Sequence, residues 1–443
     1  MTLGPRTEPD EELVFAAVAI DEPTFAAARR YAMRAGRVVE RDGASVLGWG
    51  DAAHIELPLG LDDRSGVTAA SRRLAAIRPW RDTDASLVPG PVAIGALAFD
   101  PGGWSELLVP AVQVVSRGDE LQATAVGTPE QVEVALGAFP FLAGASPPTG
   151  SGVSDDEPPD RFELRSVHGH DDFRVRVARA LDAIHQGAFE KVVLVREVAV
   201  DANRPLRQHH LLERLRALHP SCCSFAIDGF VGASPELLVR RRGDEVVSQP
   251  LAGTVARSGD PEEDRHLAAA LLASEKERAE HRIVVDAIVH ALAAHCSSLD
   301  APTVPHLLAL RNVAHLATRV TGTLRPSSDR GAGETGAPAV ATALDLLAAV
   351  HPTPAVGGSP REAALDYLRK TEDVERGRFA GPVGWVRADG DGEWWIGIRS
   401  AIIDGTRARL FAGVGIVDGS DPASELAETQ LKLQALLAVA VRP

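Results

Sequence analysis

Near the C-terminus of the 443-residue chain, three charged residues follow one another at helical spacing. Glu425, Glu428 and Lys432 are three and four residues apart, which places them on one face of a helix. Asp421 suits the N-cap of that helix, and Pro422 suits its first helical position. Two neighbouring carboxylates can hold a divalent cation, whereas on a solvated helix face the same pattern needs no ligand. The spacing alone leaves both interpretations open.

Two residues suited to acid–base chemistry stand at the entrances of predicted strands. Lys191 begins an apolar, β-branched stretch that predicts a strand over 189–200, and Glu236 enters an apolar run after Pro235. A lysine acts as a base only where its site favours the neutral form, and a carboxyl acts as an acid only where a dry pocket keeps its proton. The alternative for Lys191 is an ordinary surface lysine. The alternative for Glu236 is an outward-facing side chain on a half-buried strand, and periodicity alone favours that orientation.

A long helix is predicted from 260 to about 295, and it carries Glu277, Glu280 and His281 on one face. This group could be half of a metal site, although a solvated face explains the same spacing. Residues 249–254 are interpreted as a turn.

Two more polar residues fall in apolar segments. His315 lies within a strand predicted over 313–322, and Arg399 lies in a later apolar strand. A buried guanidinium requires a carboxylate or phosphate partner.

The residues suited to chemistry are distributed unevenly along the chain. Residues 1–140 carry no chemical constellation, and we interpret them as a structural part that completes a sheet. Residues 141–160 are rich in Gly, Ser, Pro and acidic residues, which predicts a linker or surface loop. The candidate residues all fall in 161–443. In the first part, the predicted strands are 13–20 and 92–99, and the predicted helices are 25–36 and 130–137.

Composition restricts the partners. A net charge of −15 argues against nucleic acid or an anionic membrane surface, because both require a basic footprint. The three cysteines form no metal-binding pattern, which is typical of a reduced, cytoplasmic protein. The first apolar run, 13–20, lacks a basic leader and is too short to span a bilayer. We therefore expect a cytoplasmic protein that acts on a small molecule, with no nucleic-acid or membrane partner.

Eight stretches of the second part, taken together, resemble the chorismate-utilising enzymes. This family includes isochorismate synthases, salicylate synthases, anthranilate synthase large subunits and aminodeoxychorismate synthases. Eight stretches in the family's order are far more specific than any single motif, whereas the first 160 residues match only loosely. The stretches are 191–196 (KVVLVR), 232–238 (GASPELL), 250–254 (PLAGT), 274–285 (SEKERAEHRIVV), 351–355 (HPTPA), 375–385 (ERGRFAGPVGW), 398–400 (IRS) and 412–432.

The resemblance implies an α+β fold in which two mixed β-sheets pack as a sandwich with helices on the outside and the active site in the cleft between the sheet halves. It also implies Mg²⁺ held through Glu280 and Glu428, with Glu425 in or near the shell, and chorismate as the substrate. Magnesium suits a site with few protein carboxylates, several waters and a substrate oxygen.

The resemblance further assigns residues to the substrate. Arg399 and Lys432 resemble the family's anchors for substrate carboxylate, together with backbone amides near Gly413 and Gly415. The ring pocket is expected to be lined by His315, Gly253 and Thr254. Family members are often monomeric, so we expect a monomer.

Two positions distinguish members of the family. Lys191 stands where anthranilate synthases have Gln, and a lysine beside ring carbon 2 can deprotonate a water while Glu236 protonates the hydroxyl that leaves carbon 4. Ala355 stands where salicylate synthases and ammonia users typically have Thr. Together these residues favour an isochorismate synthase. Salicylate synthase is the first alternative, followed by an ammonia-dependent synthase component or a non-catalytic relative.

Two departures from the family pattern accompany this interpretation. Phe379 replaces a frequent Tyr, and Thr254 replaces a frequent Ser. Neither change removes a proton-transfer or metal-binding group. The pathway that the product would serve, menaquinone or a salicylate-type siderophore, stays open.

Overall fold

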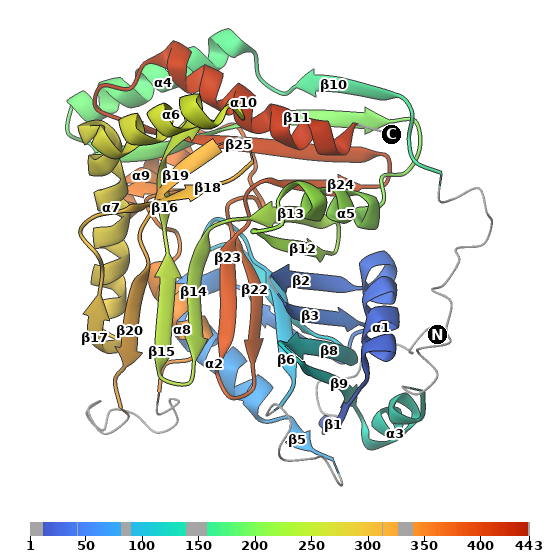
Figure 1. Ribbon diagram of the computed structural model, residues 1–443. Helices are drawn as coiled ribbons and strands as arrows, with labels where there is room; N and C mark the ends of the chain where they lie inside the picture. Colours follow the sequence, from blue (N-terminus) through green and yellow to red (C-terminus); the bar gives the residue numbers. More distant parts are fainter. Residues whose placement is uncertain are drawn as a thin grey trace.

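The computed structural model describes residues 12–41, 43–80, 90–138, 157–311, 313–326 and 340–441. In this part of the chain the strands form three sheets of 13, 9 and 3 strands (Figure 1). The strand pairings are antiparallel except for the parallel pair β1–β5.

The largest sheet combines strands from both ends of the chain. Its order is β10-β11-β25-β24-β13-β12-β2-β3-β8-β9-β1-β5, and β21 also pairs with β11. The strands are β1 (Val14–Ala19), β2 (Arg37–Arg41), β3 (Ala44–Trp49), β5 (Arg78–Pro79), β8 (Val112–Arg117), β9 (Glu120–Gly127), β10 (Phe162–Ser166), β11 (Lys191–Ala202), β12 (Cys223–Ile227), β13 (Phe230–Ser234), β21 (Gly358–Ser359), β24 (Ser400–Asp404) and β25 (Arg407–Val417).

The second sheet has the order β17-β20-β15-β14-β23-β22-β6-β7-β4, and the third has the order β16-β19-β18. The second sheet comprises β4 (Ala53–Leu57), β6 (Val92–Ala96), β7 (Ser105–Val109), β14 (Leu237–Arg242), β15 (Glu245–Gln249), β17 (Cys296–Asp300), β20 (Val320–Leu324), β22 (Pro382–Arg387) and β23 (Gly392–Ile396). The third comprises β16 (Leu251–Ala256), β18 (His306–Ala309) and β19 (Val313–Ala317).

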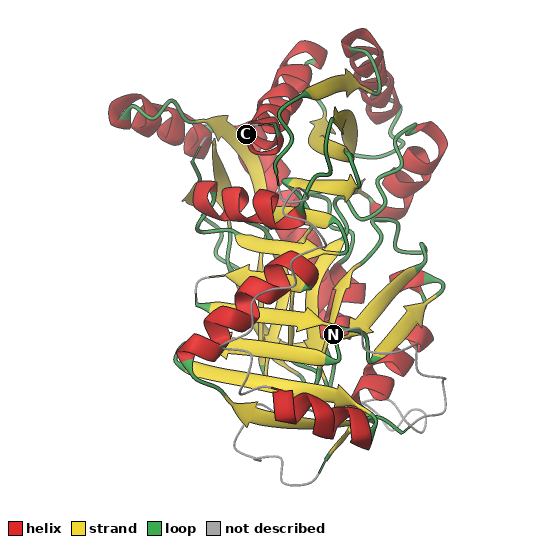
Figure 2. Cartoon of the chain, turned by 90° about the vertical axis from the view of Figure 1, so that its right-hand side faces the viewer, coloured by secondary structure: helices red, strands yellow, loops and turns green. Residues whose placement is uncertain are grey.

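Helices cover the outer faces of the sheets. In Figure 2 the strands of the largest sheet are stacked like a ladder, and helices run across the face toward the viewer. The helices are α1 (Glu22–Ala35), α2 (Arg64–Ala75), α3 (Pro129–Ala138), α4 (His170–His185), α5 (Gln208–Leu218), α6 (Pro261–Ala273), α7 (Glu275–Ala293), α8 (Ala343–Val350), α9 (Arg361–Thr371) and α10 (Pro422–Ala440), with a short 3₁₀ helix at Gly60–Asp62.

The hydrophobic core joins the two larger sheets. One buried cluster includes Val39 of β2 and Phe225 of β12 together with Val383 of β22 and Trp395 of β23. Side chains of both sheets therefore interdigitate, as in a sandwich. The predicted α+β class is confirmed, and the three-stranded sheet is an addition to it.

The single helix predicted over 260–295 is wrong. Ser274 has an extended backbone, with φ −68° and ψ 115°, so α6 ends at Ala273 and α7 begins at Glu275. The Ser274 side chain accepts a hydrogen bond from the Glu277 amide, which is the usual way to satisfy the first turn of a new helix. The break lets α7 turn its own face toward the site.

Two further sequence interpretations are corrected. The segment expected to be a turn at 249–254 contributes to β16, which pairs with β19. The strand expected over 313–322 is two strands, β19 and β20, which belong to different sheets. Most of the predicted linker at 141–160 lies outside the described residues, which resume at residue 157.

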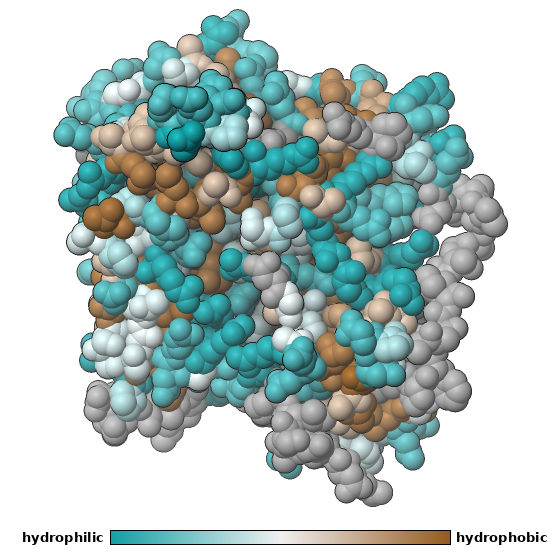
Figure 3. Space-filling view, in the orientation of Figure 1, coloured by the Kyte–Doolittle hydropathy of each residue, from teal (hydrophilic) through white to brown (hydrophobic). Residues whose placement is uncertain are grey.

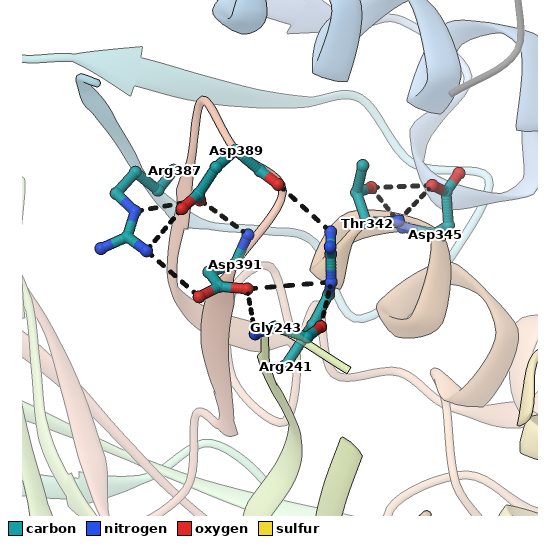
Figure 4. Close-up of polar contacts among 7 residues, drawn as sticks. All are labelled: Arg241, Gly243, Thr342, Asp345, Arg387, Asp389 and Asp391. Carbon is teal, nitrogen blue, oxygen red and sulfur yellow. Dashed lines mark hydrogen bonds and ion pairs between the residues drawn. The ribbon is translucent and has the colours of Figure 1, made fainter. Parts of the chain in front are cut away.

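The tip of the β22–β23 hairpin is clamped to its neighbours by paired charges (Figure 4). Arg387 donates to both Asp389 and Asp391, and Asp391 accepts from the Gly243 amide of the β14–β15 hairpin. The Gly390 carbonyl accepts from the amide of Ala343, the first residue of α8. This clamp fixes the start of α8, which leads into the 351–355 segment beside the site.

The outer surface mixes polar and apolar residues. On the face shown in Figure 3, hydrophilic residues predominate and hydrophobic residues form separate groups between them. No helix within the described ranges is long and apolar enough to cross a membrane.

Candidate active site

One cavity is lined by every residue that the resemblance assigns to catalysis, to the metal, to the substrate or to the choice of reaction. Its walls come from β11, β16, β19, β25, α7, α10 and the segments that link strands of different sheets. The candidates are Lys191, Glu236, Gly253, Thr254, Glu280, His315, Ala355, Arg399, Gly413, Gly415, Glu425, Glu428 and Lys432. Residues as far apart as 191 and 432 therefore meet at a single site.

Lys191 lies at the bottom of this cavity and is 1% exposed. Its Nζ is 2.8 Å from Glu280 Oε1 on α7. Burial tends to raise the pKa of Glu280, but the charge and hydrogen bond of Lys191 outweigh burial and hold that pKa below its usual value. A Cβ atom at Gly415 would lie 2.6 Å from Glu280 Oε1 and 2.9 Å from Lys191 Cε, so this position of β25 requires glycine.

Glu236 lies where the chain passes from β13 of the largest sheet to β14 of the second sheet. It is 4% exposed, so the outward-facing orientation favoured by periodicity is wrong. Alternation fails because Pro235 and Glu236 link two sheets and belong to neither strand. Burial raises the pKa of Glu236 to about 8, while the Leu251 amide, 3.4 Å from Oε1, and Lys191 act in the opposite direction. Glu236 is therefore a carboxyl that keeps its proton at neutral pH.

The charged face of α10 points into the cavity, so the interpretation as a solvated face is wrong. Glu425 is buried, and burial together with the charge of Glu428 raises its pKa to about 7, against a hydrogen bond from Ser420. Lys432 Nζ lies 2.8 Å from Glu428 Oε1 and donates to the Gly413 carbonyl at 2.9 Å. The role of Lys432 as an anchor for substrate carboxylate stays a prediction.

Arg399 and His315 form a hydrogen-bonded chain along one wall. The expectation that Arg399 lies in a strand is wrong. Arg399 lies in the link before β24, and its φ of 50° is uncommon for a residue with a side chain. Its Nη2 donates to His315 Nε2 at 2.8 Å. The proton of the neutral ring is then on His315 Nδ1. This nitrogen lies 3.1 Å from Thr254 Oγ1 and 3.3 Å from the Gly253 carbonyl oxygen. Burial, followed by the charges of Arg399 and Lys432, holds the pKa of His315 well below its usual value, so the ring is neutral.

Arg399 also offers an unused donor. Its Nη1 atom is buried and has no hydrogen-bond partner among the described residues. A buried guanidinium with a free N–H is a natural partner for a carboxylate.

Sequence reasoning missed two polar residues that line the cavity, Lys276 and Arg376, and it named Glu277 only as part of a possible half of a metal site. Glu277 and Glu280 are one turn apart on α7, and this spacing was the signal for Glu277. Burial and the charge of Glu280 raise the pKa of Glu277. His281, which was grouped with these two residues, instead faces the core, where its Nε2 lies 2.7 Å from Thr318 Oγ1.

Arg376 holds the wall of the cavity together. Its guanidinium pairs with Glu372 at 2.6 Å and donates to the Val356 and Val193 carbonyls at 2.8 and 2.6 Å. It therefore connects β11 to the segment that carries Ala355. Nothing in the charged sequence around Arg376, 371–379 (TEDVERGRF), indicates this role.

The described residues contain no ready-made cluster of three or more His, Cys, Asp or Glu side chains around a metal position. The carboxylates of the cavity are instead paired with lysines, Glu280 with Lys191 and Glu428 with Lys432. Magnesium needs only one or two protein carboxylates, because waters and substrate oxygens complete its shell. The donor set of this cavity fits that requirement.

A family model described as "Chorismate binding enzyme" matches residues 39–441, which is most of the chain. The chain belongs to this family. The resemblance inferred from the eight stretches is confirmed. The match also includes most of the N-terminal part, where the sequence motifs were weak.

Relatives within the chorismate-binding enzymes carry related names. A putative isochorismate synthase MenF from Mycobacterium tuberculosis is 36% identical over 401 residues, which cover 87% of this chain and 96% of that protein. The salicylate biosynthesis isochorismate synthase of Pseudomonas aeruginosa is 37% identical over 383 residues, covering 79% of this chain and 75% of that protein. The solved structure of MenF, the menaquinone-specific isochorismate synthase from Escherichia coli, superposes with a TM-score of 0.76 at 25% identity, covering 97% of this chain and 95% of that one.

Proposed function

We propose that this chorismate-binding enzyme is an isochorismate synthase, which converts chorismate to isochorismate with the help of Mg²⁺. The observation that carries the proposal is the pairing of a buried lysine with a protonated carboxyl in one cavity. Lys191 comes from the largest sheet, and Glu236 comes from the link to the second sheet. General acid–base catalysis requires a proton acceptor and a proton donor in one site.

In the proposed reaction, water attacks ring carbon 2 and the hydroxyl of carbon 4 leaves. Lys191 accepts a proton from the attacking water, and Glu236 donates its proton to the departing hydroxyl, so that one water is consumed and one is released. Lys191 has to be without its proton when water attacks, so its contact with Glu280 at 2.8 Å must change before this step. The raised pKa of Glu236, about 8, keeps the acid protonated at neutral pH.

Substrate binding is assigned to the cationic wall of the cavity. Arg399, with its unused Nη1 donor, and Lys432 would bind the carboxylates of chorismate, together with backbone amides near Gly413 and Gly415. The neutral His315 and its partners Gly253 and Thr254 would line the ring.

The metal is proposed to be Mg²⁺. Glu280 and Glu428 would hold it, with Glu425 in or near its shell, and the bound ion would neutralise and orient the ring carboxylate of chorismate. Four carboxylates line this side of the cavity, and two of them, Glu277 and Glu425, have raised pKa values because they are buried and lie near other acids. A bound cation would relieve this crowding.

The runner-up is salicylate synthase, which also eliminates pyruvate from isochorismate. Ala355 lines the cavity where the resemblance associates Thr with elimination and with ammonia use, so it favours the simpler reaction.

We also propose that the enzyme is a monomer of the cytoplasm without a nucleic-acid or membrane partner. Residues 1–140 are proposed to complete the sandwich, and 141–160 to link them to a catalytic region at 161–443.

Product analysis tests this function. Purified protein is incubated with chorismate and Mg²⁺, and the products are separated by chromatography. Isochorismate as the sole product supports the proposal. Salicylate with pyruvate would identify the runner-up, product only in the presence of ammonia would indicate a synthase component, and no product would indicate a non-catalytic relative.

A further inference from the structure

Three lysines form ion pairs with three of the carboxylates on the side of the cavity where Mg²⁺ is proposed to bind. Glu280 is paired with Lys191 at 2.8 Å, Glu428 with Lys432 at 2.8 Å, and Glu425 with Lys276 at 3.8 Å. These carboxylates belong to two helices, α7 and α10, that face each other across the cavity. Any added cation therefore enters a site whose negative charge is already partly balanced by lysines.

The three lysines are not held equally. The Lys191 side chain is 1% exposed, and Lys432 is fixed by a second bond, to the Gly413 carbonyl at 2.9 Å. The Lys276 side chain is 45% exposed, and its Nζ makes the longest of the three contacts. An exposed lysine pair at this distance contributes little stability, so its separation is easy. Lys276 is therefore the ammonium group that can move away at the least cost.

The position of Lys276 extends its influence beyond its own partner. It lies in the first turn of α7, adjacent to Glu277, and its side chain crosses from α7 to Glu425 of α10. Glu277 and Glu280 line the same cavity as Lys276 and Glu425. One exposed positive charge thus lies among several of the carboxylates that are proposed to hold or surround the metal.

We propose that Lys276 is a built-in counterion that competes with the divalent cation for the carboxylates of α7 and α10, and that it afterwards attracts the anionic substrate to the cavity mouth. This inference rests on the proposed function, since it takes both Mg²⁺ and a dianionic substrate as ligands. In the metal-free protein the ammonium group offsets Glu425. When a cation enters, the ammonium group moves outward, where its charge favours the approach of a carboxylate.

The two parts of this role predict opposite changes in the affinities for Mg²⁺ and for chorismate when the charge of Lys276 is removed. Removing the charge of Lys276 removes a competitor, so Mg²⁺ binds more tightly. The same change removes an attractive charge from the mouth, so chorismate binds more weakly. A variant that merely disturbed the local structure would weaken both ligands.

Isothermal titration calorimetry with Mg²⁺, in the absence of substrate, measures the first effect. For Lys276→Gln we expect Mg²⁺ to bind about tenfold more tightly than to the parent, as for the loss of one partly screened charge at close range. Steady-state assays at saturating Mg²⁺ measure the second effect, and we expect KM for chorismate to rise several-fold with a smaller change in kcat. Lys276→Arg retains the charge and should resemble the parent in both measurements.

The matched control is Lys370→Gln, which removes the same charge from α9, where Lys370 is 69% exposed and pairs with Asp366. It should leave both ligands unaffected. If Lys276→Gln binds Mg²⁺ no more tightly than the parent, while the parent binds Mg²⁺ and forms isochorismate, the inference is wrong and the proposed function stands. A parent that binds no Mg²⁺ would overturn this inference and the metal assignment together.

Discussion

Replacing Glu236 by Gln should remove turnover and at the same time stabilise the protein, increasingly so as the pH rises. The ordinary pKa of a glutamate is 4.5, and burial raises the pKa of Glu236 to about 8. Between these values the unfolded chain releases a proton that the folded chain retains, so the folded state loses stability as the pH increases. Gln cannot ionise, and its amide oxygen can still accept the hydrogen bond from the Leu251 amide.

The size of the effect follows from the same two pKa values. Each pH unit between 4.5 and 8 costs about 1.4 kcal/mol, which gives about 3 kcal/mol at pH 7. For a chain of 443 residues, an unfolding entropy of about 2.1 cal/mol/K per residue makes 1 kcal/mol equal to about 1 °C in Tm. Glu236→Gln should therefore melt about 3 °C higher than the parent at pH 7, apart from any pH-independent offset.

The assay is scanning calorimetry of parent and variant from pH 4.5 to 8.5, with isochorismate formation measured on the same samples. Glu133→Gln, a change of the same type at an exposed position of α3, serves as the control. A difference in Tm that stays constant over this range would refute the argument that Glu236 is buried with its proton. Turnover at the parental rate would refute its role as the acid.

Three other predictions concern the cavity. Lys191→Met should abolish isochorismate formation while the circular dichroism spectrum stays native, and turnover at the parental rate would exclude Lys191 as the base. Arg399→Lys should raise KM for chorismate at least tenfold, because lysine lacks the forked guanidinium that contacts His315 and offers a second donor; an unchanged KM would argue against substrate contact. EDTA should remove activity and added Mg²⁺ should restore it, whereas full activity in metal-free buffer would contradict the metal assignment.

The sequence predicted the family and the residues of the cavity better than it predicted the elements that carry them. Motifs in a fixed order identified Lys191, Glu236 and Glu428 without any knowledge of their surroundings. Periodicity by itself misled, because Glu236 lies on a link between sheets, where alternation no longer reports which side is buried. In the same way, Arg399 was placed in a strand because apolar residues surround it, whereas its backbone has a positive φ.

The break at Ser274 could have been recognised from the sequence. Ser274 is followed three residues later by Glu277, which is the spacing of a helix N-cap and its partner. The absence of Gly or Pro at the junction concealed it. The contacts of Arg376 with backbone carbonyls could not have been predicted, because they depend on how β11 and the 356 region approach each other in space.

The division of the largest sheet between the two ends of the chain has a consequence for any shortened form of this protein. Strand β12 borders β2, and in the second sheet β22 borders β6, so the N-terminal strands form one end of each sheet and cover the edges of β12 and β22. A chain beginning near residue 161 would leave β12 and β22 with unpaired edges, which favour aggregation. The residues of the cavity all lie after that point. We nevertheless expect a fragment that contains every one of them to be insoluble. The N-terminal strands line no part of the cavity, but they cover the strand edges that would otherwise aggregate.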